Sequence, residues 1–349
     1  MKNENHLLTA IQLIRNGKTL SSEEIAEAFR IIMGGEAPDG LIGAFLGILA
    51  TRIPTSEELF GASVVMRECV SKIEFPNPEN LLDTCGTGGA PKTFNVSTAA
   101  GIVAAACGVR VAKHGNRSRT GRGSAEVLDG LGININSTIE QQKRCLEEVG
   151  ICFCFAPNHH KAVAHVMPVR KQLKFPTIFN LLGPLTNPCN AGRQLIGVWD
   201  KSFVIPMASS LLESGTTKSA VVHSTDGLDE LSISAPTYIA YIKNNEITED
   251  EIHPTDFGLK VWDREEVVAT DLKSAISFVQ NGISPGSFGA VRDMIVLSAS
   301  VGLFLANRAE TISEGVLKAS DAIDSGSVTE LLSKWAEISY MHTPSTEDN

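Results

Sequence analysis

The sequence predicts an α/β fold, with a small all-helical domain and a large α/β domain that has a largely parallel central sheet. Two observations lead to this prediction. The first part of the chain has apolar residues at helical spacing, and the rest alternates short apolar runs with helical segments. A length of 349 residues also favours two domains over one. We expect the helical domain to span 1–75, joined by about 161–188, and the α/β domain to span 76–160 and 189–349.

Four short helices are expected in the helical domain. Apolar residues at helical spacing indicate the first and the third, namely Leu7, Leu8, Ile11 and Ile14, and then Leu41, Phe45 and Leu49. In a capping box, a Ser or Thr and a Glu three residues later satisfy each other's backbone N–H groups. This signature indicates the starts of the second and fourth helices, at Ser21 with Glu24 and at Thr55 with Glu58.

The segment Phe75-Pro76-Asn77-Pro78 is a predicted linker between the two patterns. Beyond it, strands are expected near 81–83, 109–112, 151–155, 195–199 and 220–223, and helices near 96–107, 124–131 and 159–173. From Asp271 the pattern is mostly helical. The apolar segment 294–306 indicates a buried helix, because it is too short to cross a membrane.

The composition limits the possible functions. A net charge of −10 argues against nucleic acid as the main partner, although a local basic pocket is compatible with it. Seven cysteines without a C-x-x-C pair favour neither a disulfide framework nor a zinc site. Cys152 and Cys154 alternate with Ile151, Phe153 and Phe155, so we interpret them as core residues of a strand and not as a redox pair. The N-terminal segment lacks the pattern of a signal peptide, and we expect a cytoplasmic protein with no membrane partner.

A glycine-rich loop follows the first expected strand. It reads Gly86-Thr87-Gly88-Gly89-Ala90-Pro91-Lys92-Thr93, and a helix is expected to begin near Ser97 and Thr98. Glycine lets backbone N–H groups approach phosphate oxygens, and helix N-termini attract anions. Pro91 stands where the ATP-binding P-loop and the dinucleotide-binding motif both need Gly, and proline has no N–H to donate. The loop therefore predicts another kind of phosphate site, with a glycine turn that binds no ligand as the alternative.

Two further polar segments come next. Lys113-His114-Gly115-Asn116-Arg117 is expected to follow the second strand, and the adjoining segment 118–124 is rich in glycine, hydroxyl groups and arginine. Ligands bind at such positions in open α/β sheets. Together with the first loop, these segments can form a cradle for a doubly phosphorylated sugar. A solvated basic turn is the alternative.

A third candidate element, Asp226-Gly227-Leu228-Asp229-Glu230, follows the strand that is expected to end near His223. Adjacent carboxylates repel each other unless a cation lies between them. Mg²⁺ is the natural candidate, because it binds one or two carboxylates together with phosphate oxygens. An ordinary acidic turn is the alternative.

These motifs, in this order, resemble those of the anthranilate phosphoribosyltransferases over nearly the whole chain. The segments that carry the resemblance are 86–89 with 95–98, 113–117, 168–170, 177–188 and 226–230. The resemblance implies a nucleoside phosphorylase/phosphoribosyltransferase-like fold, usually as a homodimer. It also implies a reaction of tryptophan biosynthesis, in which the amine of anthranilate displaces pyrophosphate from C1 of phosphoribosyl pyrophosphate, with Mg²⁺ bound to the leaving group.

The resemblance further implies roles for individual residues. The implied catalytic residues are Lys113, Asn116 and Arg170, and the implied magnesium ligands are Ser97, Asp229 and Glu230. Phosphoribosyl pyrophosphate would contact Gly86, Gly89, Ala90, Thr93, Asn95, Val96, Ser97, Thr98, Lys113, His114, Gly115, Asn116, Arg117 and Ser124. Anthranilate would contact Gly86, Asn116, His160, Arg170 and Gly183, with His159 and His165 as alternatives to His160. A guanidinium such as that of Arg170 suits the anthranilate carboxylate, because the two groups pair in a planar fork.

Two departures from the family pattern lie in the phosphate region. Ala90-Pro91 stand where the family usually has Asp-Gly, in a loop one residue shorter, so a carboxylate near the ribose phosphate is missing. A contact between Lys92 and a phosphate could compensate for it. The segment 118–124 is also one residue shorter, and Arg119 and Arg122 replace hydroxyl groups or Lys. Substrate affinity and the number of metal ions are therefore open.

Two other functions are compatible with parts of the sequence. Arg122-Gly123-Ser124 is similar to loops of the pyrimidine nucleoside phosphorylases, but Arg117 and the Asp229-Glu230 pair favour the transferase. A non-catalytic, nucleic-acid-binding paralogue would need a basic groove, and the net charge of −10 argues against it.

Overall fold

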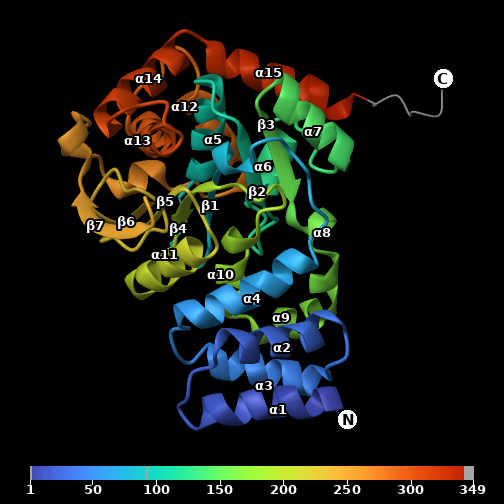
Figure 1. The fold of residues 1–349 in the computed structure, drawn as a ribbon. Coiled ribbons are helices and arrows are strands. Elements are labelled where there is room, and N and C mark those ends of the chain that lie inside the picture. Colours follow the sequence, from blue (N-terminus) through green and yellow to red (C-terminus); the bar gives the residue numbers. More distant parts are fainter. Residues whose placement is uncertain (1, 92, 342–349) are drawn as a thin grey trace, which may run out of the picture.

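The chain folds into a group of helices and a larger part built on a seven-stranded sheet (Figure 1). The computed structural model describes residues 2–91 and 93–341. The N-terminal helices lie at one end of the molecule, and the C-terminal helices cover the sheet at the other end (Figure 1). Both predicted fold elements, the helical domain and the largely parallel sheet, are confirmed.

Four helices begin the chain: α1 (Lys2–Arg15), α2 (Ser22–Met33), α3 (Asp39–Leu49) and α4 (Ser56–Glu68). Both predicted capping boxes are present, because the side chains of Ser21 and Thr55 accept hydrogen bonds from the amides of Glu24 and Glu58. These helices bury one continuous apolar cluster, which includes Phe29 and Phe45 at ring centroids 6.3 Å apart.

A later part of the chain packs on these helices. It contains α8 (Ala156–His159), η2 (Lys161–His165), α9 (Met167–Leu173), α10 (Ile178–Leu182) and η3 (Pro184–Thr186). Helix α9 contacts α3, and α10 contacts α4 (Figure 1). The expected continuous helix over 159–173 is wrong. His160 leaves the helical conformation with φ −105° and ψ 57°, and Pro168 cannot donate the backbone hydrogen bond of a continuous helix.

Glu58 is a fully buried carboxylate that connects the start of α4 to the rest of the helical part. It accepts hydrogen bonds from the amides of Leu20, at 2.8 Å, and Thr55, at 2.9 Å, and pairs with the guanidinium of Arg52. Removal of one partner leaves a buried charge uncompensated.

Glu58→Ala is therefore expected to lower the free energy of unfolding by about 3–5 kcal/mol. The measurement is urea denaturation followed by circular dichroism. Glu57→Ala is the matched control, since Glu57 is exposed on the same turn and its removal should change stability by less than about 0.5 kcal/mol. Equal effects of the two changes would contradict a structural role for the buried pair.

The sheet contains β1 (Leu82–Gly86), β2 (Val111–Gly115), β3 (Ile151–Phe155), β4 (Arg193–Gly197), β5 (Lys218–Ser224), β6 (Thr237–Lys243) and β7 (Glu246–Ile252). Its order is β3-β2-β1-β4-β5-β6-β7. The first five strands are parallel, and β6 and β7 extend the sheet antiparallel to β5. The carboxyl ends of the five parallel strands therefore lie at one edge.

Three expected strand positions need correction, since the strand expected at 195–199 runs from Arg193 to Gly197. The strand near 81–83 begins at Leu82 and continues to Gly86, so Thr84 and Cys85 belong to the strand. The strand expected at 109–112 runs from Val111 to Gly115. Lys113, His114 and Gly115 are therefore strand residues, although they were expected in the loop after it. Lys113 is therefore a buried residue of β2 and not a loop residue.

Helices cover the sheet. The elements are η1 (Pro78–Asn80), α5 (Val96–Ala106), α6 (Ser124–Gly130), α7 (Ile139–Glu148), η4 (Lys201–Phe203), α11 (Val204–Glu213), η5 (Pro254–Phe257), η6 (Arg264–Val267), α12 (Leu272–Gly282), α13 (Ala290–Leu305), α14 (Ile312–Asp324) and α15 (Ser327–Tyr340). Helices α5 and α13 pack on each other and on β1, whereas α11 contacts β5 and β6. Among the described helices, none has the length and apolar character to cross a bilayer.

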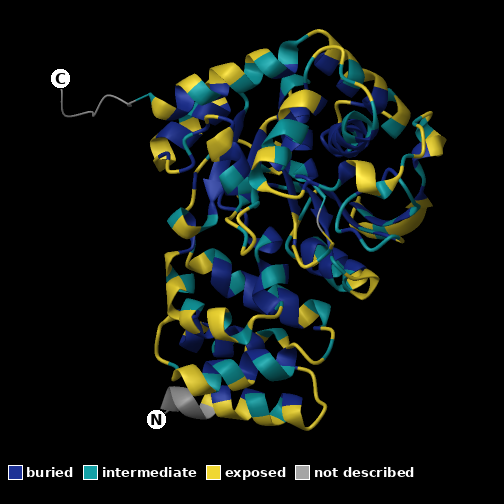
Figure 2. Ribbon diagram, turned by 180° about the vertical axis from the view of Figure 1, so that it is seen from behind, coloured by how far each residue is buried: buried dark blue, intermediate teal, exposed yellow. Residues whose placement is uncertain are grey.

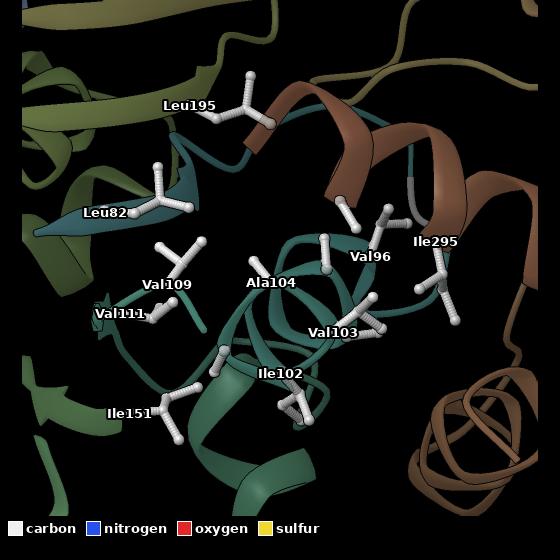
Figure 3. Close-up of a cluster of buried hydrophobic side chains, with 14 of the residues drawn as sticks. Leu82, Val96, Ile102, Val103, Ala104, Val109, Val111, Ile151, Leu195 and Ile295 are labelled. Atoms are coloured by element: carbon white, nitrogen blue, oxygen red, sulfur yellow. The ribbon is translucent and has the colours of Figure 1, made fainter. Parts of the chain in front are cut away.

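Helix α5 lies at the centre of the main core. Its side chains Val96, Ile102 and Val103 pack among residues of the sheet and of α13 (Figure 3). The strands β1 to β5 are mostly buried, whereas β7 and the outer faces of many helices are exposed (Figure 2). The small residues of α5 allow close approach, because a Cβ on Gly101 would lie 3.0 Å from Oγ1 of Thr84. The start of α5 is held against β1 by a hydrogen bond from the hydroxyl of Thr84 to the carbonyl of Ser97 at 2.8 Å.

Candidate active site

The carboxyl edge of the sheet has a topological switch point. From β1 the chain connects to β2 on one side, whereas β4 pairs with β1 on the other side. Gly86 and Gly197, the last residues of β1 and β4, are paired in register. In open α/β sheets, ligands bind at such a point. The loops that follow β1, β2 and β5 are the three segments that the sequence predicts to bind the substrate.

Hydrogen bonds connect the loop after β1 to the loop after β5. The backbone N–H of Gly88 donates to Oδ2 of Asp229 at 3.0 Å. Gly88 and Gly89 have φ of 65° and 102°, which favour glycine, and a Cβ on Gly89 would lie 3.3 Å from the ring of Trp199. The amide of Thr87 donates to the carbonyl of Gly197 at 2.9 Å. The glycine turn and the acidic loop therefore lie side by side, as expected from the sequence.

The acidic loop also reaches the start of α5. The N–H of Ser97 donates to Oε1 of Glu230 at 3.4 Å. Desolvation, and after it the negative charge of Asp229, raise the pKa of Glu230 to about 8. Two adjacent carboxyl groups beside the hydroxyl-bearing Ser97 form an oxygen donor set of the kind that Mg²⁺ takes. Burial and the neighbouring carboxylate both oppose ionisation of Glu230, and a divalent cation between the two carboxyl groups would offset this cost.

Gly197 provides the space for the acidic loop. A Cβ at this position would lie 1.6 Å from the carbonyl oxygen of Asp229, so any side chain must displace the loop.

Gly197→Ala is expected to reduce kcat/KM by about 100-fold, the effect of a displacement of roughly 1 Å in a catalytic group. Initial rates with the two substrates that the family resemblance implies provide the measurement. Gly47→Ala, on α3, is the control, because a Cβ added there would have no other atom within 4 Å, and this change should leave activity unaltered. Full activity of Gly197→Ala would show that the position of the acidic loop does not matter.

Lys113 lies beneath the site. Its side chain is 1% exposed, and Nζ donates to the carbonyl of Thr84 at 2.6 Å and to Oγ of Ser97 at 3.5 Å. Burial lowers its pKa, whereas the nearby groups of Asp83, Cys85 and Glu230 act in the opposite direction. Lys113 thus supplies positive charge from behind Ser97, and its hydrogen bonds join β1 to the start of α5.

The side chains of Asp83 and Asn187 form a buried hydrogen bond. Neither side chain was assigned a role in the sequence analysis. Oδ1 of Asp83 accepts a hydrogen bond from the N–H of His114 at 3.0 Å, and Oδ2 accepts from Nδ2 of Asn187 at 2.8 Å. Burial raises the pKa of Asp83 to about 6, although Lys113 opposes this shift. The sequence did contain one sign of a buried carboxylate, because Asp83 directly follows the apolar pair Leu81-Leu82.

The start of α5 presents polar groups to the same edge. Asn95 stands at the N-cap position without a side-chain cap, and its Nδ2 donates to the carbonyl of Arg122 at 3.3 Å. The hydroxyl of Thr93 donates to the carbonyl of Phe94 at 3.1 Å. The buried hydroxyl of Thr98 has no hydrogen-bond partner among the described residues. Lys92 lies outside the residues that the structure describes.

The loop after β2 folds back on itself. Oδ1 of Asn116 accepts a hydrogen bond from the N–H of Arg117 at 2.7 Å, and both residues are exposed. The hydroxyl of Ser124 donates to the carbonyl of Asn116 at 3.4 Å. A Cβ on Gly115 would lie 2.2 Å from Oγ of Ser124, so only glycine fits there. The exposed Arg117 and the returning start of α6 therefore flank the end of β2.

The three candidate histidines have different surroundings. Nε2 of His160 lies 3.2 Å from Nε2 of His114, whose Nδ1 lies 3.1 Å from the carbonyl oxygen of Gly183. Burial, followed by the nearby His159, lowers the pKa of His160 to about 4. His159 instead lies 2.7 Å from the carbonyl oxygen of Ser71. The structure thus groups His160 with His114 and Gly183, and it places the exposed His165 beside Gly35, away from this group.

Arg170, on α9, is a half-buried guanidinium without a carboxylate partner among the described residues. It lies over the ring of Phe179 at 5.0 Å. Burial lowers its pKa to about 10, and the positive charge of Arg119 contributes in the same direction. Helix α10 is connected to the glycine loop, because Nδ2 of Asn180 donates to the carbonyl of Thr87 at 3.3 Å. Arg170 therefore lies beside α10, the helix that contacts the glycine turn through Asn180.

Comparison with known proteins agrees with this geometry. Residues 78–329 match the glycosyl transferase family, a/b domain, and residues 8–70 match the glycosyl transferase family, helical bundle domain. The fold and site thus define a two-domain glycosyl transferase.

Individual relatives identify the family within this class of glycosyl transferases. The chain is 40% identical over 332 residues to anthranilate phosphoribosyltransferase of Methylobacillus flagellatus, and the alignment covers 95% of this chain and 97% of the relative. It is 42% identical over 335 residues to that of Rubrobacter xylanophilus, with coverage of 95% and 97%. The crystal structure of the Thermus thermophilus enzyme superposes with a TM-score of 0.88 at 32% identity, and the alignment covers 95% of this chain and 99% of that chain. The chain belongs to the anthranilate phosphoribosyltransferase family.

A structure from Saccharomyces cerevisiae adds information on ligands. Anthranilate phosphoribosyltransferase from that yeast, in complex with PRPP and Mg, superposes with a TM-score of 0.86 at 25% identity. The alignment covers 96% of this chain and 98% of the yeast chain.

Proposed function

We propose that this chain transfers the phosphoribosyl group of phosphoribosyl pyrophosphate to the amine of anthranilate and releases pyrophosphate, a reaction of tryptophan biosynthesis. One observation carries the proposal at the level of residues. Hydrogen bonds join three segments far apart in the sequence, from Gly88 to Asp229, from Ser97 to Glu230 and from Lys113 to Ser97. A pentose with phosphate groups at two positions needs such a convergent polar surface.

The leaving pyrophosphate is the group that this surface would stabilise. Backbone N–H groups of the glycine turn, together with the hydroxyl of Ser97 and the charge of Lys113, would face its oxygens. Asp229, Glu230 and Ser97 would hold Mg²⁺, which supplies positive charge to phosphate oxygens when bound. Such electrostatic stabilisation of developing charge is commonly the largest contribution to catalysis.

The second substrate would lie between the sheet edge and α9. Arg170 would bind the carboxylate of anthranilate and so orient its amine toward C1 of the ribose. An arylamine is already a nucleophile, and its alignment with C1 supplies much of the remaining rate. The neutral pair of His114 and His160, both with lowered pKa, would form an uncharged wall beside Gly183. We assign Asn116 to the border between the two substrates.

The replacement at Ala90-Pro91 remains compatible with this function. The carboxylates of Asp229 and Glu230 are both present near the glycine turn, so the loss of the usual Asp does not remove the proposed metal site. We expect the replacement at Ala90-Pro91 to alter the affinity for the ribose phosphate.

A direct assay tests the proposed function. The purified chain is incubated with anthranilate, phosphoribosyl pyrophosphate and Mg²⁺, and consumption of anthranilate is followed by its fluorescence. Parallel reactions contain uridine or thymidine with phosphate. Consumption of anthranilate without cleavage of either nucleoside supports the proposal. Cleavage of a nucleoside without consumption of anthranilate would favour the phosphorylase.

Removal of divalent metal is expected to reduce the transfer rate by about 100-fold or more, because pyrophosphate would leave without a charge-neutralising ion. The measurement is the initial rate in EDTA, followed by addition of excess Mg²⁺. Restoration by Mg²⁺ is expected, and K⁺ at matched ionic strength is the control. Turnover that is insensitive to EDTA would remove the metal role from Asp229 and Glu230.

The oligomeric state and the cellular location of the protein are also proposals. We propose a homodimer in the cytoplasm, on the basis of the family to which the chain belongs. Light scattering on the purified protein tests the dimer, and a monomer mass at micromolar concentration would contradict it.

A further inference from the structure

Three cysteine thiols meet in the core, and the proposed active site uses none of them. Cys152 and Cys154 lie on β3, and Cys189 lies in the loop after η3. Sγ of Cys154 is 3.8 Å from Sγ of Cys152 and 3.9 Å from Sγ of Cys189. All three sulfur atoms lie within 4.8 Å of one another, and the three residues are at most 2% exposed.

The local structure places these thiols together. Residues two apart on a strand point to the same face of the sheet, which brings Cys152 and Cys154 to one side. The prediction that they are buried strand residues is confirmed. Cys189 is held by its backbone, because its N–H donates to Oδ1 of Asn187 at 2.8 Å. Asn187 is itself fixed by its hydrogen bond to Asp83. The third thiol comes from a distant part of the sequence, so C-x-x-C spacing could not indicate it.

Two of the three distances between the sulfur atoms match those of a metal centre with three thiolate ligands. A metal–thiolate bond of about 2.3 Å, in a planar arrangement of three ligands, separates the sulfur atoms by about 4.0 Å. The two measured distances, 3.8 and 3.9 Å, are within about 0.2 Å of this value. Thiol ligands select soft cations such as Cu(I). We propose that Cys152, Cys154 and Cys189 form a three-coordinate binding site for a soft monovalent cation of the Cu(I) class.

The surroundings favour a monovalent, three-coordinate ion over zinc. Structural zinc takes four ligands. The imidazole of His159 cannot provide the fourth, because its two ring nitrogens lie 2.7 Å from the carbonyl oxygen of Ser71 and 2.9 Å from Oε1 of Gln142. Among the described residues, the cluster contains no fourth His, Cys, Asp or Glu side chain within the same reach.

Copper loading of the full chain tests the proposal. The protein is reduced with a thiol-free reductant without oxygen, then loaded with Cu(I) from a chelator of known affinity until the copper content is constant. Because the thiols are buried, a second sample is refolded from urea with Cu(I) present. We expect one tightly held copper ion per chain, and X-ray absorption should show three sulfur neighbours at about 2.3 Å. Nitrogen or oxygen neighbours would overturn the site, as would no retained copper in both samples.

Variants separate this site from the other thiols. Cys154→Ala and Cys189→Ala should each reduce the affinity for Cu(I) at least tenfold, with circular dichroism and transferase activity confirming that they fold. Cys69→Ala and Cys107→Ala are the controls, because these cysteines lie outside the cluster, and they should retain the ion. An equal loss of Cu(I) affinity in the two control variants would overturn the proposal. Displacement of Cu(I) by equimolar Zn(II) would contradict the preference for a monovalent ion.

Discussion

Glu230→Gln is expected to reduce kcat/KM for the transferase reaction by about 100- to 1000-fold, the effect of removing one electrostatic group from a catalytic site. The substitution keeps the shape of the side chain and removes its charge. Glu230 lies at hydrogen-bond distance from the amide of Ser97 and next to Asp229, so it occupies the centre of the proposed metal site. Steady-state rates as a function of Mg²⁺ are the measurement. The Mg²⁺ concentration that gives half-maximal activity should rise.

Stability measurements separate this catalytic role from a structural one. Desolvation and the charge of Asp229 raise the pKa of Glu230, so the ionised carboxylate is unfavourable in the protein without metal. Neutral Gln should therefore leave the metal-free protein at least as stable as the original. Glu251→Gln, on exposed β7, is the control and should change neither property. A large loss of stability with an unchanged Mg²⁺ requirement would assign Glu230 to the scaffold.

Much of the fold was predictable because it depends on local patterns. The capping boxes at Ser21 and Thr55 define the starts of two helices through contacts three residues apart. The antiparallel strands β6 and β7 were missed. Their turn is Asn244-Asn245, with φ of 53° and 63°, and two consecutive residues with positive φ are typical of a type I′ hairpin turn. Asn-Asn is a weaker signal than Asn-Gly, and β7 has too many carboxylates to resemble a strand.

The candidate site was predictable as a set of loops but not as a set of contacts. The order of glycine, basic and acidic segments indicated an anion site with a cation. The sequence could not show that Lys113 lies in the core, because that depends on β2 extending to Gly115. Nor could it choose among three histidines, since the hydrogen bonds of His159 to Ser71 and Gln142 depend on tertiary packing. Burial and pairing across the sheet determine these roles.

Arg170→Ala is expected to raise KM for anthranilate about 10- to 100-fold, with little change in KM for phosphoribosyl pyrophosphate. A hydrogen bond to a charged group contributes about 1.5–3 kcal/mol, which corresponds to this range. Arg170 has no carboxylate partner among the described residues, and both burial and Arg119 lower its pKa, so an anionic ligand would relieve an unfavourable charge. The measurement is a pair of substrate titrations, each at saturation of the other substrate.

Two further variants determine whether the guanidinium itself is recognised. Arg170→Lys keeps the charge but loses the planar fork, so its KM for anthranilate should lie between those of the original protein and Arg170→Ala. Lys171→Ala removes an exposed cation from the next position of α9 and should leave both KM values unchanged. The increase in KM caused by Arg170→Ala should also be smaller with aniline in place of anthranilate. Aniline lacks the carboxylate, so Arg170 has no anion to bind. Equal increases of KM for both substrates in Arg170→Ala would instead indicate that the residue supports the packing of α9 on Phe179.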